Sequence, residues 1–127
     1  MHDLVSITPF DLIGSDERGI TAKFKLPRTQ ADFLFLTRKA QSVSGNTYHE
    51  GNNSGTNPKL FILASGTIKL TYRKVGTTSI LEEVIAQPSL IQICPYVIHK
   101  IEVINDSILI ECNSIEDIQK DRIKECV

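Results

Sequence analysis

The sequence has few cysteines. Cys94, Cys112 and Cys126 are the three among 127 residues, and no pair has CxxC spacing. An odd number without that spacing predicts neither a disulfide framework nor a zinc ribbon. We therefore expect a reduced, cytoplasmic protein in which Cys94 and Cys112 are buried within apolar strands.

Long apolar runs and an excess of either charge are also missing. No run approaches the roughly 18 residues that span a bilayer, and the N-terminal residues 1–4 do not resemble a signal peptide. Fourteen basic side chains balance fifteen acidic ones, and the pI is near 6.3. Nucleic-acid-binding surfaces normally carry a basic stripe. The composition therefore predicts neither a membrane nor a nucleic-acid partner.

What the sequence does contain is a series of short strands. Residues 1–127 are expected to form one domain, long enough to bury most of its apolar surface. Strand patterns bounded by Gly, Pro or Asn occupy residues 4–7, 20–26, 32–37, 42–49, 59–64, 67–73, 79–85, 90–94, 99–103 and 108–112. Turns are expected at Gly66 and at residues 105–107, and residues 32–37 are expected to be covered on both faces. This spacing predicts an all-β sandwich or barrel with a core at about 20–113.

One helix is expected, at the C-terminal end of the sequence. Ser114 and Asp117 form a capping-box-like start, and Ile115, Ile118 and Ile123 fall near one face. The pattern predicts a short helix at about 114–124 that packs on the β-domain or on a second subunit.

A few polar side chains share faces with apolar ones on the predicted strands. Thr47 and His49 lie on one face, Lys59 and Phe61 on another, and His99 opens a third strand. If these faces point inward, the polar groups meet in an apolar cavity, as in many small-molecule sites.

The same segments resemble a known superfamily. They are residues 45–49 (Gly-Asn-Thr-Tyr-His), the strand 59–66, residues 93–95 (Ile-Cys-Pro) and His99. Together they resemble the cupins, and the turn at 16–19 (Asp-Glu-Arg-Gly) is similar to one in dTDP-4-dehydrorhamnose 3,5-epimerases. The resemblance extends to dTDP-sugar 3,4-ketoisomerases and to the cupin domains of capsule-synthesis enzymes. It implies a double-stranded β-helix, the cupin jelly roll.

The metal-ligand positions implied by the resemblance are mostly changed. Metal-binding cupins use a His-x-His pair, a Glu and a late His, and here those positions read Thr47, His49, Lys59 and His99. Two imidazoles are too few for a firm divalent site, and an ammonium group repels a cation. We therefore expect no metal and no cofactor.

The catalytic residues implied by the resemblance are also reduced in number. The epimerase base falls at Thr47, which is no general base near neutral pH, and only His49 remains of the two ketoisomerase histidines. His49 is the candidate base, with His99 as its partner or as the acid. Lys59 would hold an anion or stabilise an enolate if it points inward. A shift of one residue would place Leu60 inside instead, and the apolar pair Leu60–Phe61 leaves both registers open.

Six further residues are expected to contact the ligand: Thr47, Tyr48, Phe61, Tyr72, Tyr96 and Arg18. For Tyr72 the alternative is core packing. For Arg18, as for Arg38 and Lys39, the alternative is a solvated surface position.

Three functions remain open. The first is an epimerase or isomerase of a keto-sugar nucleotide in surface-polysaccharide synthesis. The second is a non-catalytic cupin that binds a small sugar or anion, which the change to Thr47 favours. The third is a metal-dependent cupin enzyme, which Lys59 argues against. A homodimer is expected through residues 33–36 and the terminal helix.

Overall fold

Two long antiparallel strands, β6 (Lys59–Lys74) and β9 (Val97–Glu111), form the frame of the computed structural model, which describes residues 3–127. They pair along most of their length, from Phe61 opposite Glu111 to Lys74 opposite Val97. The other elements are β1 (Val5–Pro9), β2 (Asp11–Asp16), β3 (Gly19–Lys23), β4 (Leu34–Arg38), β5 (Val43–Tyr48), β7 (Leu81–Ile85), β8 (Ser89–Ile93), α1 (Ile115–Lys120) and β10 (Ile123–Lys124).

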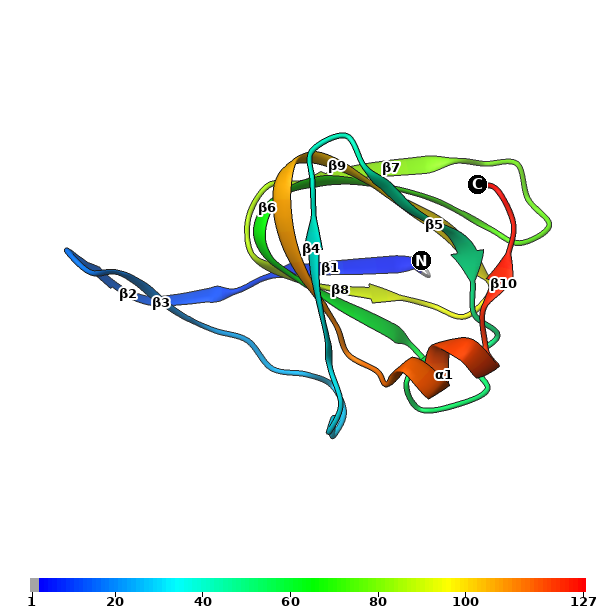
Figure 1. Ribbon diagram of the computed structural model, residues 1–127, viewed down its shortest axis with the longest axis horizontal. Helices are drawn as coiled ribbons and strands as arrows, with labels where there is room; N and C mark the ends of the chain where they lie inside the picture. The colour runs from blue at the N-terminus through cyan, green and yellow to red at the C-terminus, as the bar shows by residue number, and fades with distance from the viewer. Residues whose placement is uncertain (1–2) are drawn as a thin grey trace.

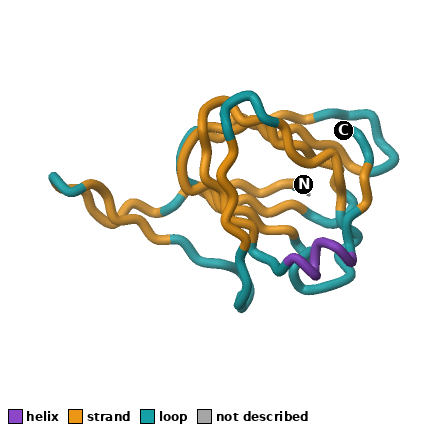
Figure 2. Tube along the Cα trace, viewed as in Figure 1, coloured by secondary structure: helices purple, strands orange, loops and turns teal. Residues whose placement is uncertain are grey.

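The two long strands bend in the middle and take part in two layers (Figures 1 and 2). In the first layer, residues 59–63 of β6 pair with β8, which pairs with β1, while the end of β9 pairs with β4. In the second, residues 68–72 of β6 pair with β7, and the start of β9 pairs with β5, which pairs with β10. The result is the all-β jelly roll with a short C-terminal helix that the sequence predicts.

The bend itself corrects two predictions. Gly66 and residues 105–107, expected to be turns, lie inside β6 and β9, where the register between the strands shifts. Gly66 has φ of +97°, and a Cβ there would collide with Ser107 Oγ and lie 2.6 Å from Asp106 O. The side chain of Asn105 accepts a hydrogen bond from Thr67 N at 2.7 Å. These residue types favour turns, but here the two strands stay paired, and the same residues produce the bend in both strands.

The apolar core lies between the layers. Alternate residues of the strands point into it, and each buried Leu or Ile side chain stabilises the fold by about 1.5–3 kcal/mol. Its most buried members are Leu63, Ile68, Leu70, Ile91, Ile93, Val97, Val103 and Leu109. Tyr72 belongs to the same cluster, which confirms that its strand presents it inward.

A second apolar cluster lies on the outer face of the first layer and fixes the register of β6. Leu60 and Ile62 pack there with Leu90 and Cys112, so Lys59 and Phe61 point inward. Both faces of this strand are covered, which is why the apolar pattern alone left two registers open.

A hairpin of β2 and β3 extends away from the two layers as an arm (Figure 1). All residues from 11 to 21 are exposed, among them Leu12, Ile13 and Ile20 at 63–64% of their possible surface. The strand predicted at 20–26 therefore ends earlier, at Lys23, because it pairs only with β2.

β4 also departs from its prediction. It was expected to be covered on both sides, but Phe35 is 68% exposed on its outer face. β4 pairs only with β9 and forms the edge of its layer. Its inward side chains, Leu34 and Leu36, line the cavity between the layers.

The terminal helix is shorter than predicted. Ser114 and Asp117 form the expected capping box, but α1 ends after Lys120, and Ile123 pairs with Tyr48 in a short strand instead of continuing the helix. Asp121 leaves the helical conformation (φ −148°, ψ 62°). None of the helices in residues 3–127 is long and apolar enough to cross a membrane.

Candidate active site

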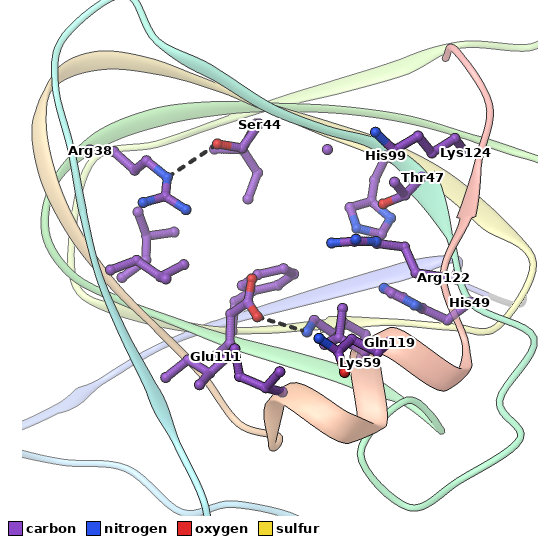
Figure 3. Close-up of a pocket in the computed structure, with 18 residues that line it drawn as sticks. Arg38, Ser44, Thr47, His49, Lys59, His99, Glu111, Gln119, Arg122 and Lys124 are labelled. Atoms are coloured by element: carbon purple, nitrogen blue, oxygen red, sulfur yellow. Dashed lines mark hydrogen bonds and ion pairs between the residues drawn. The ribbon is translucent and has the colours of Figure 1, made fainter.

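A cavity of about 390 Å³ opens between the two layers and is walled on one side by α1 and β10 (Figure 3). Small-molecule sites commonly have this size. Its apolar wall consists of Leu34, Leu36, Phe61, Ile101, Leu109, Ile115 and Ile118. Its polar side chains are Arg38, Ser44, Thr47, His49, Lys59, His99, Glu111, Gln119, Arg122 and Lys124.

His49 lies just after β5 and is 4% exposed. Its Nδ1 donates a hydrogen bond to the main-chain carbonyl of Asp121. Burial lowers the pKa of the imidazole below its usual value, although the Asp121 carbonyl partly offsets this. His49 is therefore neutral near pH 7. The proton sits on Nδ1, so Nε2, which has no hydrogen-bond partner within residues 3–127, is left as a proton acceptor.

His99, on β9, lies close to His49, with 5.8 Å between the ring centroids. Its Nδ1 donates to the Val97 carbonyl at 3.0 Å. Burial lowers the pKa of His99 to about 4. Of the two roles expected for His99, the structure favours the neutral partner, because an acid needs a proton that this ring does not carry at Nε2 near neutral pH.

The burial of His99 predicts a pH-dependent stability. An unfolded histidine has a pKa near 6.5, so between pH 6.5 and 4 the unfolded state binds more protons than the folded one. The free energy of unfolding should therefore fall by roughly 3 kcal/mol as the pH drops through this window. Urea unfolding near pH 7 and near pH 4 would measure it. His99→Gln should flatten the difference, and an equal slope in both proteins would contradict the assignment.

Lys59, at the start of β6, is 1% exposed and points into the cavity beside Glu111 (Figure 3). Its Nζ lies 3.3 Å from Glu111 Oε2, donates to Asn113 Oδ1, and sits 4.9 Å from the centroid of the Phe61 ring. Burial lowers the pKa of Lys59 to about 8, although Glu111 offsets part of the effect. The ammonium group is thus mostly charged at neutral pH, and two of its three N–H groups are used by protein partners.

The cavity carries an excess of positive charge. Arg38, Lys59, Arg122 and Lys124 line it, and Glu111 is the one carboxylate among the described lining residues. In Figure 3, Arg38 lies on one side, where it donates to Ser44 Oγ at 3.2 Å, and the other cations lie across the cavity from it. Such a concave, cationic site attracts anions.

The structure brings together some of the expected ligand contacts and separates others. Thr47 and Phe61 line the cavity. Tyr72 lies in the core, and Tyr48 faces Tyr96 at 6.0 Å between ring centroids, outside the described lining. Arg18 is at the tip of the arm, paired with Asp16 at 2.7 Å. None of these four residues lines the cavity within one chain. Tyr48 alternates with the inward Thr47, Tyr72 is packed inside the apolar core, Tyr96 precedes β9, and Arg18 lies on the arm.

Several lining residues were missed by the sequence analysis. Glu111 alternates with Leu109 on the last long strand, a signal that could have identified it. Arg122 and Lys124 flank Ile123 with strand periodicity, but only two residues of this strand pair with β5, and the segment was assigned to the helix.

The lining residues do not fit a divalent metal. His49 and His99 supply two imidazoles, and the charged Lys59 occupies the same cavity. Within residues 3–127, no three His, Cys, Asp or Glu side chains are placed to share an ion. Divalent metal sites normally use three or more such ligands.

Comparison with solved structures shows that the chain has the fold of RmlC-like cupins. The sugar 3,4-ketoisomerase QdtA from Thermoanaerobacterium thermosaccharolyticum, solved with TDP, superposes with a TM-score of 0.74 at 15% identity, covering 98% of this chain and 90% of that one. A 3,4-ketoisomerase from Helicobacter canadensis gives 0.74 at 12%, covering 98% and 92%. An RmlC 3,5-epimerase from Legionella pneumophila, with dTDP-4-keto-L-rhamnose, gives 0.68 at 11%, covering 98% and 73%.

The similarity is one of structure. No protein-family model and no curated protein sequence matches this sequence. The expected cupin fold is confirmed, while the activity of this chain has to be argued from its own cavity.

Proposed function

We propose, from this RmlC-like cupin fold and its cationic cavity, that the protein is an isomerase or epimerase of a nucleotide-linked keto sugar in surface-polysaccharide synthesis. One observation carries the proposal: a neutral imidazole and a buried ammonium group line the same cavity. A base and a cation are what proton removal beside a ketone requires.

The reaction begins at His49. Nε2 takes the proton from the carbon next to the sugar ketone, and its lone pair becomes part of the new N–H bond. The electrons of the broken C–H bond form the enolate, whose oxygen lies against the remaining N–H of Lys59. To move the carbonyl, the imidazolium returns its proton to the former carbonyl carbon, while the proton of the neighbouring hydroxyl passes to the enolate oxygen. To invert the centre, the enolate carbon takes a proton from water on the opposite face, and His49 releases its own proton to solvent. His99 Nε2 accepts a hydrogen bond from the neighbouring hydroxyl.

The diphosphate of the ligand suits the remaining cations. Arg122 and Lys124 are exposed at the cavity wall formed by the C-terminal segment, and Arg38 lies opposite. Guanidinium groups bind phosphate oxygens through paired N–H donors. The structurally similar ketoisomerase QdtA was solved in complex with TDP, which supports a nucleoside diphosphate as the ligand class. We also propose a cytoplasmic location, because the odd number of cysteines favours a reducing compartment.

The test is proton exchange. TDP-4-keto-6-deoxyglucose, the ligand of a QdtA variant, is incubated with the protein in heavy water and followed by proton NMR. We expect deuterium to enter at the carbon beside the ketone. If the sugar binds and no exchange occurs, the alternative of a non-catalytic sugar- or anion-binding cupin is favoured, which Thr47 at the epimerase base position supports.

The charge of the tail should control affinity. Replacing Arg122 and Lys124 by glutamine is expected to weaken binding of dTDP roughly tenfold or more, since each lost contact with a charged group is worth about 1.5–3 kcal/mol. Lys69→Gln is the matched control, because Lys69 pairs with Glu82 and Glu102 instead of lining the cavity. Titration calorimetry would measure both, and equal affinities for all three proteins would contradict this binding mode.

We further propose a homodimer, as expected from the sequence. Phe35 on β4 and Ile115 on α1 are 68% and 51% exposed, and the arm adds Leu12, Ile13 and Ile20. A second copy could cover these apolar side chains. Light scattering should give close to twice the chain mass of 14.2 kDa, and a value near the chain mass itself would reject the dimer.

A further inference from the structure

Asp121 is a buried carboxylate at the end of α1, 3% exposed, and it binds the loop that follows His49. Oδ1 accepts a hydrogen bond from Glu50 N at 2.8 Å. Oδ2 accepts from Gly51 N at 2.9 Å, Asn52 N at 2.8 Å and Thr56 Oγ1 at 2.7 Å. Four donors from one loop therefore converge on a single side chain.

The main chain of the same residue contacts the proposed base. The Asp121 carbonyl accepts the hydrogen bond from His49 Nδ1, while the Asp121 N–H donates to Ile118 O at 3.2 Å. His49 immediately precedes the loop that the carboxylate binds. The Asp121 side chain thus holds the loop next to His49, and the Asp121 main chain provides the acceptor for the imidazole. Together these contacts fix the position of the ring relative to its acceptor.

The carboxylate is ionised at working pH. Burial alone would raise the pKa of Asp121, but the hydrogen bonds from Glu50, Thr56, Asn52 and Gly51 outweigh it and hold the pKa below its usual value. An ionised carboxylate is an acceptor only, which matches four donors and no acceptor among its partners.

We propose that Asp121 is the positioning residue for His49: its carboxylate holds the loop and its own carbonyl so that the imidazole stays in the Nδ1–H tautomer. Without this acceptor the ring is free to adopt the Nε2–H tautomer, in which the nitrogen that takes the substrate proton already carries one. The link to catalysis rests on the proposed function, whereas the control of the tautomer does not.

A merely structural role for Asp121 is the alternative, and Asp117 provides the comparison. Asp117 belongs to the same segment and caps α1 through Ser114 N at 3.2 Å, but it neither lines the cavity nor contacts His49. Asp117→Asn should therefore lower stability while leaving the His49 ring unchanged.

The experiment compares Asp121→Asn with Asp117→Asn by two-dimensional proton–nitrogen NMR of the histidine rings, which reports the tautomer without any substrate. Thr56→Val removes one of the four hydrogen bonds and serves if Asp121→Asn does not fold. The pH titration of the ring is recorded as well, since Lys59, Glu111, His99 and Asp121 are the charged or titratable groups around it.

We expect His49 to be Nδ1–H in the natural protein and in Asp117→Asn, and to gain the Nε2–H form in Asp121→Asn and, in part, in Thr56→Val. Exchange of the keto sugar should fall about 10- to 100-fold with Asp121→Asn. An unchanged tautomer in Asp121→Asn, or in Thr56→Val if that is the folded variant, would overturn the proposal. Absence of exchange in the natural protein would overturn the proposed function and leave the tautomer result standing.

Discussion

His49→Ala should reduce deuterium exchange into the keto sugar by roughly 10²- to 10⁴-fold, the usual contribution of a positioned general base. The reason is that His49 supplies the unprotonated Nε2 in the cavity, while its Nδ1 is committed to Asp121. The ligand should still bind within a few-fold of the natural affinity, because the cations of the cavity are unchanged.

The dependence of kcat/KM on pH provides a second test of His49 as the base. Burial lowers the pKa of His49, so the base remains unprotonated to a lower pH than an exposed histidine. The logarithm of kcat/KM should be flat near neutrality and fall only as the pH drops through a value below 6.5. His99→Gln serves as the comparison, because it alters the neighbouring ring and leaves the base in place. Exchange that survives His49→Ala but disappears with His99→Gln would transfer the role of base to His99.

Lys59→Met should lower kcat about 10²- to 10³-fold, the cost of removing a donor to a developing oxyanion. Methionine has nearly the same length and lacks the charge, so the cavity keeps its shape. The partner Glu111 has a side chain that is 20% exposed, so water can solvate it when the ammonium group is gone. The buried Asn113 Oδ1 does lose its donor, which should cost about 1–3 kcal/mol of stability. The value of kcat is therefore measured well below the melting temperature of the variant, so that the lost activity does not reflect unfolding.

A basic limb in the pH profile should identify the same group. The pKa of Lys59 is lowered to about 8, so activity should decline as the pH rises through that value and the ammonium loses its proton. Lys59→Arg keeps a charge that does not titrate, and the decline should then disappear, even if the activity is lower overall. Full activity of Lys59→Met, or an unchanged basic limb in Lys59→Arg, would exclude Lys59 as the stabilising cation.

Alternation along the predicted strands placed His49 and His99 on faces that could share a cavity, but it left two registers open for Lys59. In a strand, side-chain direction follows from position, and all three line one cavity. The sequence did not predict the structure at Gly66 and residues 105–107. Their residue types favour turns, but pairing between β6 and β9 keeps both strands continuous there.

The least predictable part of the site is its tail. Arg122 and Lys124 line the cavity and the carbonyl of Asp121 contacts His49. This segment is held there by Asp121, which ends the helix and binds a loop some seventy residues earlier in the chain. A contact between residues so far apart in the chain leaves no periodic signal in the sequence. The helix was therefore predicted to continue to about residue 124, whereas α1 ends at Lys120 and the short strand β10 follows. Tyr48 and Tyr96 lie outside the lining for two different reasons. Tyr48 ends β5 on the face opposite to Thr47, as strand alternation requires, whereas Tyr96 stands in the turn before β9, where alternation does not fix the side-chain direction.

The shared strands have a consequence for how a ligand would be received. β6 and β9 each run through both layers. Moving the layers apart would therefore break backbone hydrogen bonds between these two strands. The walls of the cavity are thus held at their working separation before the ligand arrives. A preorganised cavity of this kind loses little conformational entropy on binding, so more of the contact energy is retained as affinity. Movement on binding should be confined to the exposed side chains at the mouth.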